Sequence, residues 1–334
     1  MPLVRVATAD GRRGWGEGWS LDNDTAPFHA RLAQVGATVP GRDVTPDEAH
    51  AVLWGERNWA EASVASAIDI ALWDLLGQAR AMPVHALIGA AARAAPVYAS
   101  AGLYADGKHH ATLAAELGGY VAEGFRAVKL KIGAHGLHDD LARVAAVRHA
   151  VGDGVDIIVD ALGRLPRDAM LPWINGLAAN GVRCIQAPRP ATDLVGLASI
   201  QNDGRLTVLA GEAEFRPAAF SRLAGAVGML QPNAGLCGGL TGMLRLARTL
   251  DLPITPQCHG TSVLQAASLH FGAGCNAVAT VEYHKFHMHL SDALPPGMRQ
   301  PVAGSIRLDA RPGLGLDTAA LAGGALREVV SVWE

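Results

Sequence analysis

The stretches AVKLKIG (residues 127–133) and DIIVDA (residues 156–161) set the pattern that decides the fold of this chain. Each is a short run rich in apolar, β-branched residues that carries or ends in polar side chains. Such runs predict β-strands, and the longer Ala- and Leu-rich segments between them predict helices. Six further runs are PVYASAG (96–102), VRCIQAP (182–188), TVLAGEA (207–213), GMLQPN (228–233), PITPQCH (253–259) and AVATVEY (277–283).

Eight strands that alternate with helices predict parallel βα units, which form either a closed barrel or an open, doubly wound sheet. Reactive polar residues end nearly every run. Only a barrel brings the carboxyl ends of all its strands to one mouth, so we predict an α/β barrel over residues 96–303. The polar residues are Lys129, Lys131, Asp160, Gln186, Glu212, Asn233, His259 and Glu282.

The residues before the barrel follow a different sequence pattern. A hairpin-like start precedes AEASVASAIDIALWDLLGQ (residues 60–78), in which apolar residues recur at helical spacing. We predict a smaller α+β unit over residues 1–95, completed by residues 304–334. The length of 334 residues suits a barrel of about 250 residues with such a unit attached.

Composition excludes several classes of protein. A net charge of -3 gives no basic field for nucleic acid, and the chain has no apolar run long enough to span a membrane. Its first residues lack the apolar core of a signal peptide. Its four cysteines form no CxxC pair. We therefore expect a cytoplasmic protein with reduced thiols.

Lys129 and Lys131 lie on the same face of their strand because side chains alternate along it. Two neighbouring ammonium groups repel each other, so we expect the pKa of one of them to fall and that lysine to serve as a base. The alternative is a solvated edge strand with two exposed lysines.

Asp160 and Glu212 end separate strands, and carboxylates that converge on one point suit a hard cation such as Mg²⁺. The alternatives are a turn or helix-cap residue for Asp160 and the start of a loop for Glu212. His259 is a candidate acid or base opposite the lysines, and Glu282 a candidate hydrogen-bond donor if protonated. A structural histidine and a salt-bridged carboxylate are the alternatives for these two.

The order of these residues resembles the mandelate racemase branch of the enolase superfamily. The resemblance covers nearly the whole chain and includes IALWDLLGQARAMPVHALIGA (residues 70–90), GLCGGLTG (235–242) and PGLGLD (312–317). It implies a modified (β/α)7β barrel, of the TIM type, under an N-terminal α+β capping domain. It also implies Mg²⁺-assisted removal of the proton α to a carboxylate, which gives an enediolate.

By this resemblance Lys131 is the base, and Lys129 lowers its pKa and neutralises the carboxylate of a small-molecule substrate. Asp160, Gln186 and Glu212 take the metal-ligand positions. His259 acts on the opposite face, and Glu282 hydrogen-bonds the enediolate. Trp19 lies in a loop that closes over the substrate.

Three departures from the family pattern stand out. Gln186 replaces a metal-binding carboxylate, so we expect weaker Mg²⁺ binding. Asn233 replaces the Asp that orients the strand-seven histidine, so we expect His259 to be a poorer base. The chain also begins about one strand late, so the first strand of the capping unit is expected to be missing.

These features predict a lyase that dehydrates a hydroxy acid or acid sugar, since dehydration tolerates a weak histidine base. The alternatives are a racemase or epimerase of a 2-hydroxy acid and a catalytically impaired barrel. Cycloisomerisation is less favoured because no lysine lies near Leu236. We expect a homo-oligomer, a dimer or an octamer. His284, His287 and His289 are interpreted as a polar loop rather than as a second metal site.

Overall fold

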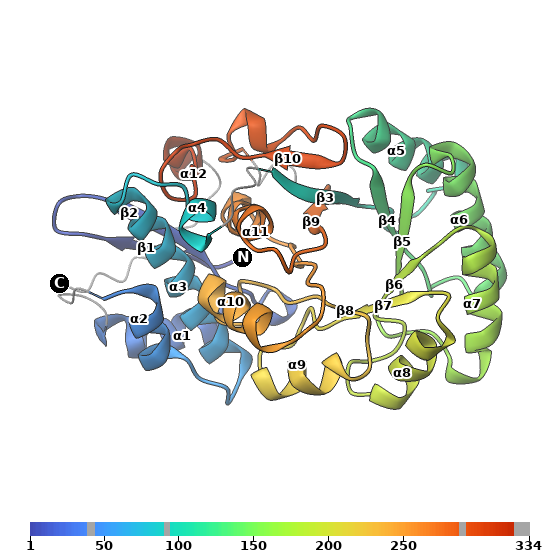
Figure 1. Ribbon diagram of the computed structural model, residues 1–334, viewed down its shortest axis with the longest axis horizontal. Coiled ribbons are helices and arrows are strands. Elements are labelled where there is room, and N and C mark those ends of the chain that lie inside the picture. The colour runs from blue at the N-terminus through green and yellow to red at the C-terminus, as the bar shows by residue number, and fades with distance from the viewer. Residues whose placement is uncertain (39–43, 90–93, 287–291, 324–334) are drawn as a thin grey trace.

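The computed structural model describes residues 1–38, 44–89, 94–286 and 292–323. Figure 1 shows a barrel of strands ringed by helices, with the blue N-terminal elements beside it. The barrel strands are β3 (Ala94–Ser100), β4 (Ala127–Lys131), β5 (Asp156–Asp160), β6 (Cys184–Gln186), β7 (Thr207–Ala210), β8 (Met229–Leu230) and β9 (Val281–His284).

These strands pair in parallel in the order β9-β3-β4-β5-β6-β7-β8. Residues 253–257 close the ring between β8 and β9 through isolated bridges, in which Leu230 pairs with Ile254 and Ile254 with Val278. The predicted seventh strand is thus reduced to bridges, because Pro253 and Pro256 have no N–H to give to a ladder.

Each barrel strand before β9 is followed by one helix, and so is the bridged segment. This order confirms the predicted (β/α)7β barrel. The helices are α5 (His110–Ala122), α6 (Leu137–Val151), α7 (Met170–Ala179), α8 (Leu194–Asp203), α9 (Pro217–Ala224), α10 (Gly239–Thr249) and α11 (Ser262–Gly274). Strand and helix side chains, among them Leu130, Val159, Val208 and Leu269, are fully buried in one continuous core. The barrel is therefore a packed body that fixes the strand ends.

The N-terminal unit is an antiparallel hairpin packed on a long helix. A Cβ atom at Gly16 would lie 1.7 Å from the carbonyl oxygen of Ala67, so only glycine allows the hairpin this close to α3. The apolar residues of α3 are buried around nearly its whole circumference. The elements are β1 (Leu3–Ala7), β2 (Arg13–Glu17), α1 (Ala26–Val35), α2 (Pro46–Leu53), α3 (Trp59–Ala79) and α4 (Val84–Ile88).

Three buried carboxylates connect this unit to the rest of the chain. Glu17 accepts hydrogen bonds from the backbone N–H groups of Thr261 and Leu264 at the start of α11. Asp69 accepts from the N–H of Thr241 at the start of α10. Asp74 accepts from the N–H groups of Trp15 and Leu314. Acidic groups suit helix N-termini because the N–H groups there have no partner within the helix.

The last part of the chain returns to the barrel and to the N-terminal unit. β10 (Ser305–Arg307) pairs antiparallel with β3, and Gly313 O accepts a hydrogen bond from the N–H of Val84. A final short helix, α12 (Thr318–Gly323), follows. Among the described residues, no helix is both long and apolar enough to span a membrane.

Candidate active site

The carboxyl ends of the barrel strands bring Lys129 to the centre of a polar network. Its side chain is 2% exposed. Its Nζ donates to Glu282 Oε1 at 2.5 Å and to Gln186 Oε1 at 2.7 Å, and it lies 3.5 Å from Asp160 Oδ2. Lys129 is therefore a fixed, buried cation that joins three strands.

The charges around Lys129 favour its protonated form. Burial by itself would lower the pKa of Lys129, but the negative charges of Glu282 and Asp160 outweigh it and raise this pKa above its ordinary value. The expected fall in the pKa of one lysine therefore does not occur at Lys129. The attraction of the carboxylates dominates the electrostatics of Lys129.

Glu282 is ionised by the same contact. Burial would raise the pKa of Glu282, but the charge of Lys129 and hydrogen bonds from Lys129 and the Cys258 N–H lower it below its ordinary value. In this arrangement Glu282 accepts hydrogen bonds. The protonated form that a donor role requires is disfavoured.

Lys131 lies beside Lys129 but is less enclosed. Its side chain is 16% exposed, and its Nζ donates to Asp160 Oδ2 at 2.5 Å. Asp160 is fully buried, and its other oxygen accepts from the Leu162 N–H at 3.1 Å. Lys131 is therefore the amine of the pair that keeps access to the mouth.

The three predicted metal-ligand positions lie together at the ends of β5, β6 and β7. Gln186 Nε2 donates to Glu212 Oε2 at 2.7 Å, and Gln186 Oε1 accepts from Lys129 and from Gln231 Nε2 at 3.0 Å. Burial, and then the charge of Asp160, raise the pKa of Glu212 to about 7. A cation bound between these two carboxylates would favour the ionised form of Glu212.

This donor set fits Mg²⁺, with one carboxylate fewer than the family pattern has. Mg²⁺ takes oxygen ligands and is often held by one or two carboxylates with water. The described residues hold no cluster of three or more His, Cys, Asp or Glu that could bind a metal ion, and the side-chain oxygen beside the two carboxylates is the amide oxygen of Gln186. That oxygen faces Lys129 here, and rotation of the amide would turn it toward the carboxylates.

The structure corrects the expected partner of Asn233. Its Nδ2 donates to Gln257 Oε1 at 2.6 Å, and its Oδ1 accepts from the Gly235 N–H at 2.7 Å. Asn233 and Gln257 also form a β-bridge. The side chain that Asn233 orients on the strand-seven segment is therefore Gln257 and not His259. Two amides meet there, and neither can act as an acid or a base near neutral pH.

His259 lies two residues further along, at an exposed position on the rim. Its ring packs edge-on against the rings of His284 at 5.9 Å and Phe286 at 6.4 Å between centroids. The ring of His284 is bound to Gly260 O at 2.8 Å. His287 and His289 lie outside the described residues.

Trp19 lies against the turn that carries Asn233. Its backbone N–H donates to Gly235 O at 3.1 Å and to Ser63 Oγ at 2.7 Å, and its indole ring packs edge-on against Trp59. The loop that the sequence identified as a specificity loop is thus fixed beside the Asn233–Gln257 pair.

Sequence reasoning missed three residues of this network: Tyr98, Gln231 and Gln257. Gln231 bridges the Tyr98 hydroxyl and Gln186 Oε1. Gln231 and Gln257 each lie two residues from a predicted site residue, Asn233 and His259. This spacing is the signal that could have identified Gln231 and Gln257, because residues two apart on a strand share a face.

Comparison with known proteins agrees with this architecture. Residues 1–89 match the family described as mandelate racemase / muconate lactonizing enzyme, N-terminal domain, and residues 112–321 match the one described as enolase C-terminal domain-like. The chain is 27% identical to an arabinonate dehydratase of Saccharolobus solfataricus, over 78% of this chain and 71% of that protein.

Two further relatives differ in activity. The chain is 29% identical to a D-galactarolactone cycloisomerase of Agrobacterium fabrum, over 94% of this chain and 88% of that protein. It is also similar to the crystal structure of a racemase from Streptomyces coelicolor A3(2) with bound magnesium. The TM-score is 0.81 and the identity 26%, over 96% of this chain and 94% of that one. The chain belongs to the enolase superfamily, with the N-terminal domain of the mandelate racemase and muconate lactonizing enzymes.

Proposed function

We propose that this protein is a Mg²⁺-dependent lyase that removes the α-proton of a hydroxy acid or acid sugar and expels the β-hydroxyl group. The observation that carries the proposal is the Asn233–Gln257 pair. The family resemblance led us to expect that Asn233, in place of the family's Asp, would orient His259. Asn233 holds Gln257 instead, so the barrel mouth has an amine base on the β4 side and amides on the other. Elimination needs one base, whereas racemisation needs one on each face of the α-carbon.

The environments of the two lysines divide their roles. Lys129 is buried and ion-paired, so it serves as a permanent positive charge for the substrate carboxylate. Lys131 is the candidate base: as a neutral amine, free of its contact with Asp160, it would take the α-proton and become an ammonium group. His259 on the rim remains the candidate that protonates the departing hydroxyl group.

Asp160, Glu212 and the Gln186 amide oxygen would hold Mg²⁺. The ion would stabilise the negative charge that develops on the substrate carboxylate when the α-proton leaves. Glu212 must be ionised to bind the ion, and its raised pKa means that a proton is released near neutral pH when it does so.

A second candidate is cycloisomerisation of an acid-sugar lactone. The sequence disfavoured it, because no lysine lies near Leu236. The Agrobacterium fabrum relative, matched over 94% of this chain, restores it. Racemisation is the weaker alternative, because the Asn233–Gln257 pair supplies no second base.

The test is a screen of aldonic, aldaric and other 2-hydroxy acids with Mg²⁺, in which a 2-keto acid product is detected by carbonyl derivatisation and mass spectrometry. We expect product from at least one acid with the native enzyme and none with Lys131→Ala. Lactone opening without a keto acid would favour the cycloisomerase. No reaction with any acid, together with no calorimetric Mg²⁺ binding, would overturn the proposal in favour of an impaired barrel.

A further inference from the structure

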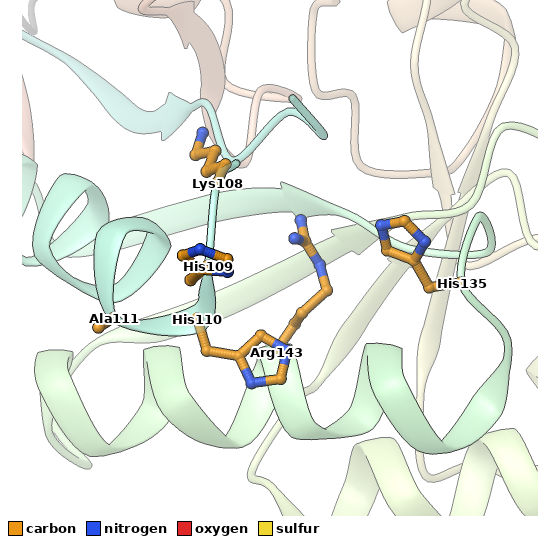
Figure 2. A pocket seen from close by; sticks show the side chains of 6 residues that line it. All are labelled: Lys108, His109, His110, Ala111, His135 and Arg143. Atoms are coloured by element: carbon orange, nitrogen blue, oxygen red, sulfur yellow. The ribbon is translucent and has the colours of Figure 1, made fainter. Parts of the chain in front are cut away.

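A second cavity lies outside the network around Lys129. It has a volume of about 400 Å³ and is lined by Lys108, His109, His110, Ala111, His135 and Arg143. Five of these six residues carry basic side chains, and none of the six is acidic. Figure 2 shows the guanidinium group of Arg143 between the rings of His109 and His135, with Lys108 above them. The cavity is thus built for an anion rather than for a cation.

One wall of the cavity is held rigid by Arg143. Its side chain is 3% exposed, its guanidinium carbon lies 4.1 Å from the centre of the Tyr104 ring, and its Nη2 donates to Gly102 O at 3.4 Å. Within the described part of the chain its Nε has no hydrogen-bond partner, and Asp140 Oδ1 lies 3.6 Å away. This Nε is buried and paired with Asp140, so a ligand in the cavity would meet the rest of the Arg143 guanidinium group, which lines it.

The loop after β4 is fixed around the same wall. Asp140 accepts from the N–H groups of Gly133 and His135 at 2.7 and 3.4 Å and from the Tyr104 hydroxyl at 2.5 Å. The rings of Tyr104 and His135 are in edge contact, with centroids 4.7 Å apart. His135 is therefore placed at the cavity before any ligand arrives.

The opposite wall is the first turn of α5, a helix of 13 residues. The helix begins at His110, and no side chain, including that of the N-cap residue His109, caps it, so its first backbone N–H groups are without a helical or capping acceptor. Helix N-termini attract anions through these donors and through the helix dipole. Lys108 lies at the same end of the helix in an ion pair with Glu116.

We propose that this cavity binds an oxyanion, the phosphate or carboxylate group of a small molecule. The loops that form it follow β3 and β4, so it lies at the same end of the barrel as Lys129 and Lys131. The oxyanion is either a free anion or the far end of an extended acid substrate. The chemistry of recognition is the same for both: charge-assisted hydrogen bonds from Arg143 and Lys108, and hydrogen bonds from the imidazole N–H groups.

The test uses inorganic phosphate, whose ³¹P NMR line broadens on binding, and needs no turnover. We expect saturable binding to the full-length protein and about tenfold weaker binding to the Lys108→Gln/His110→Gln double variant, because one or two charge-assisted hydrogen bonds are lost. Arg245→Gln, which removes an exposed basic residue outside the cavity, is the matched control and should bind as the native protein does. Lys131→Ala separates this cavity from the active site and should retain phosphate binding.

Competition identifies the source of the oxyanion. Displacement of phosphate by an aldaric acid, but not by an aldonic acid of the same length, indicates the far carboxylate of a substrate. Displacement by neither indicates a free anion. The proposal is overturned if phosphate does not bind, if the double variant binds it as tightly as the native protein, or if Lys131→Ala alone abolishes binding. These binding results can be interpreted even if the activity screen finds no substrate, because none of them requires turnover.

Discussion

Lys129 and Lys131 are separated by one residue, yet their surroundings differ sharply. We expect Lys131→Ala to lower turnover by about 10³-fold, since it removes a general base. It should cost less stability than a change at Lys129, because the Lys131 side chain is partly exposed and Asp160 Oδ2 still has Lys129 Nζ at 3.5 Å. Lys129→Met should instead destabilise the fold by about 4 kcal/mol, because it leaves Glu282 buried and unpaired. Steady-state kinetics and urea unfolding of both variants check this.

Adding Glu282→Gln to Lys129→Met provides the control, because it removes the stranded charge and should recover part of the lost stability. The division of roles would be wrong if Lys131→Ala destabilised the protein as much as Lys129→Met does.

Gln186 determines how many negative charges face the metal. We expect Gln186→Glu to tighten Mg²⁺ binding by about tenfold, because affinity for such ions grows with the charge of the ligand set. Isothermal titration calorimetry measures this directly. Asn233→Asp adds the same charge to the barrel mouth away from the predicted ligands and should leave the affinity nearly unchanged. An equal gain in both variants would show that Gln186 is not a ligand.

Residue types alone could not identify the partner of Asn233. Gln257 and His259 are two residues apart and share a face of an extended segment, so alternation does not distinguish them. Only the register between neighbouring segments does, and it pairs Asn233 with Gln257. The sequence did predict the strand-end positions of Lys129, Lys131, Asp160, Gln186 and Glu212, because each directly ends or closely follows an unambiguous apolar run.

Among the elements, α3 shows how the N-terminal unit is joined to the barrel. Its buried Asp69 has a pKa raised to about 7, mainly by burial, against 3.8 for the free group. An acid with a raised folded-state pKa stabilises the fold below its unfolded pKa, and this contribution is lost as the pH rises from about 4 to 7. At 1.36 kcal/mol per pH unit, the total is about 4 kcal/mol.

Asp69→Asn cannot ionise but keeps an oxygen for the Thr241 N–H. We expect its stability to fall less than that of the native protein as the pH rises from 4 to 7, as measured by urea unfolding across this range. Parallel pH profiles would show that the pKa of Asp69 is the same in the folded and the unfolded protein.

The existence and type of these elements were more predictable than the contacts that join them. The predicted helix over residues 60–78 agrees with α3, because its apolar spacing is dense over more than five turns. The predicted strand over residues 253–259 proved to be isolated bridges, because two prolines interrupt its ladder. The hydrogen bonds of Glu17, Asp69 and Asp74 join residues more than 160 positions apart, and no local sequence pattern predicts them.

For the whole molecule, we propose that a single amine base serves the barrel mouth and that the Asn233–Gln257 amides lie opposite it. The enolase-superfamily barrel supplies the scaffold, and the substituted pair restricts which reactions the scaffold can run. Dehydration and cycloisomerisation agree with this arrangement, whereas racemisation does not.

The most direct test is ¹H NMR of acid sugars incubated with the enzyme and Mg²⁺ in D₂O. The account predicts that the α-proton signal of a substrate is lost, through exchange or product formation, without any inverted epimer. This loss should vanish in Lys131→Ala and persist in Gln257→Ala. An epimer inverted at the α-carbon, or loss of the α-proton in Lys131→Ala, would contradict the account.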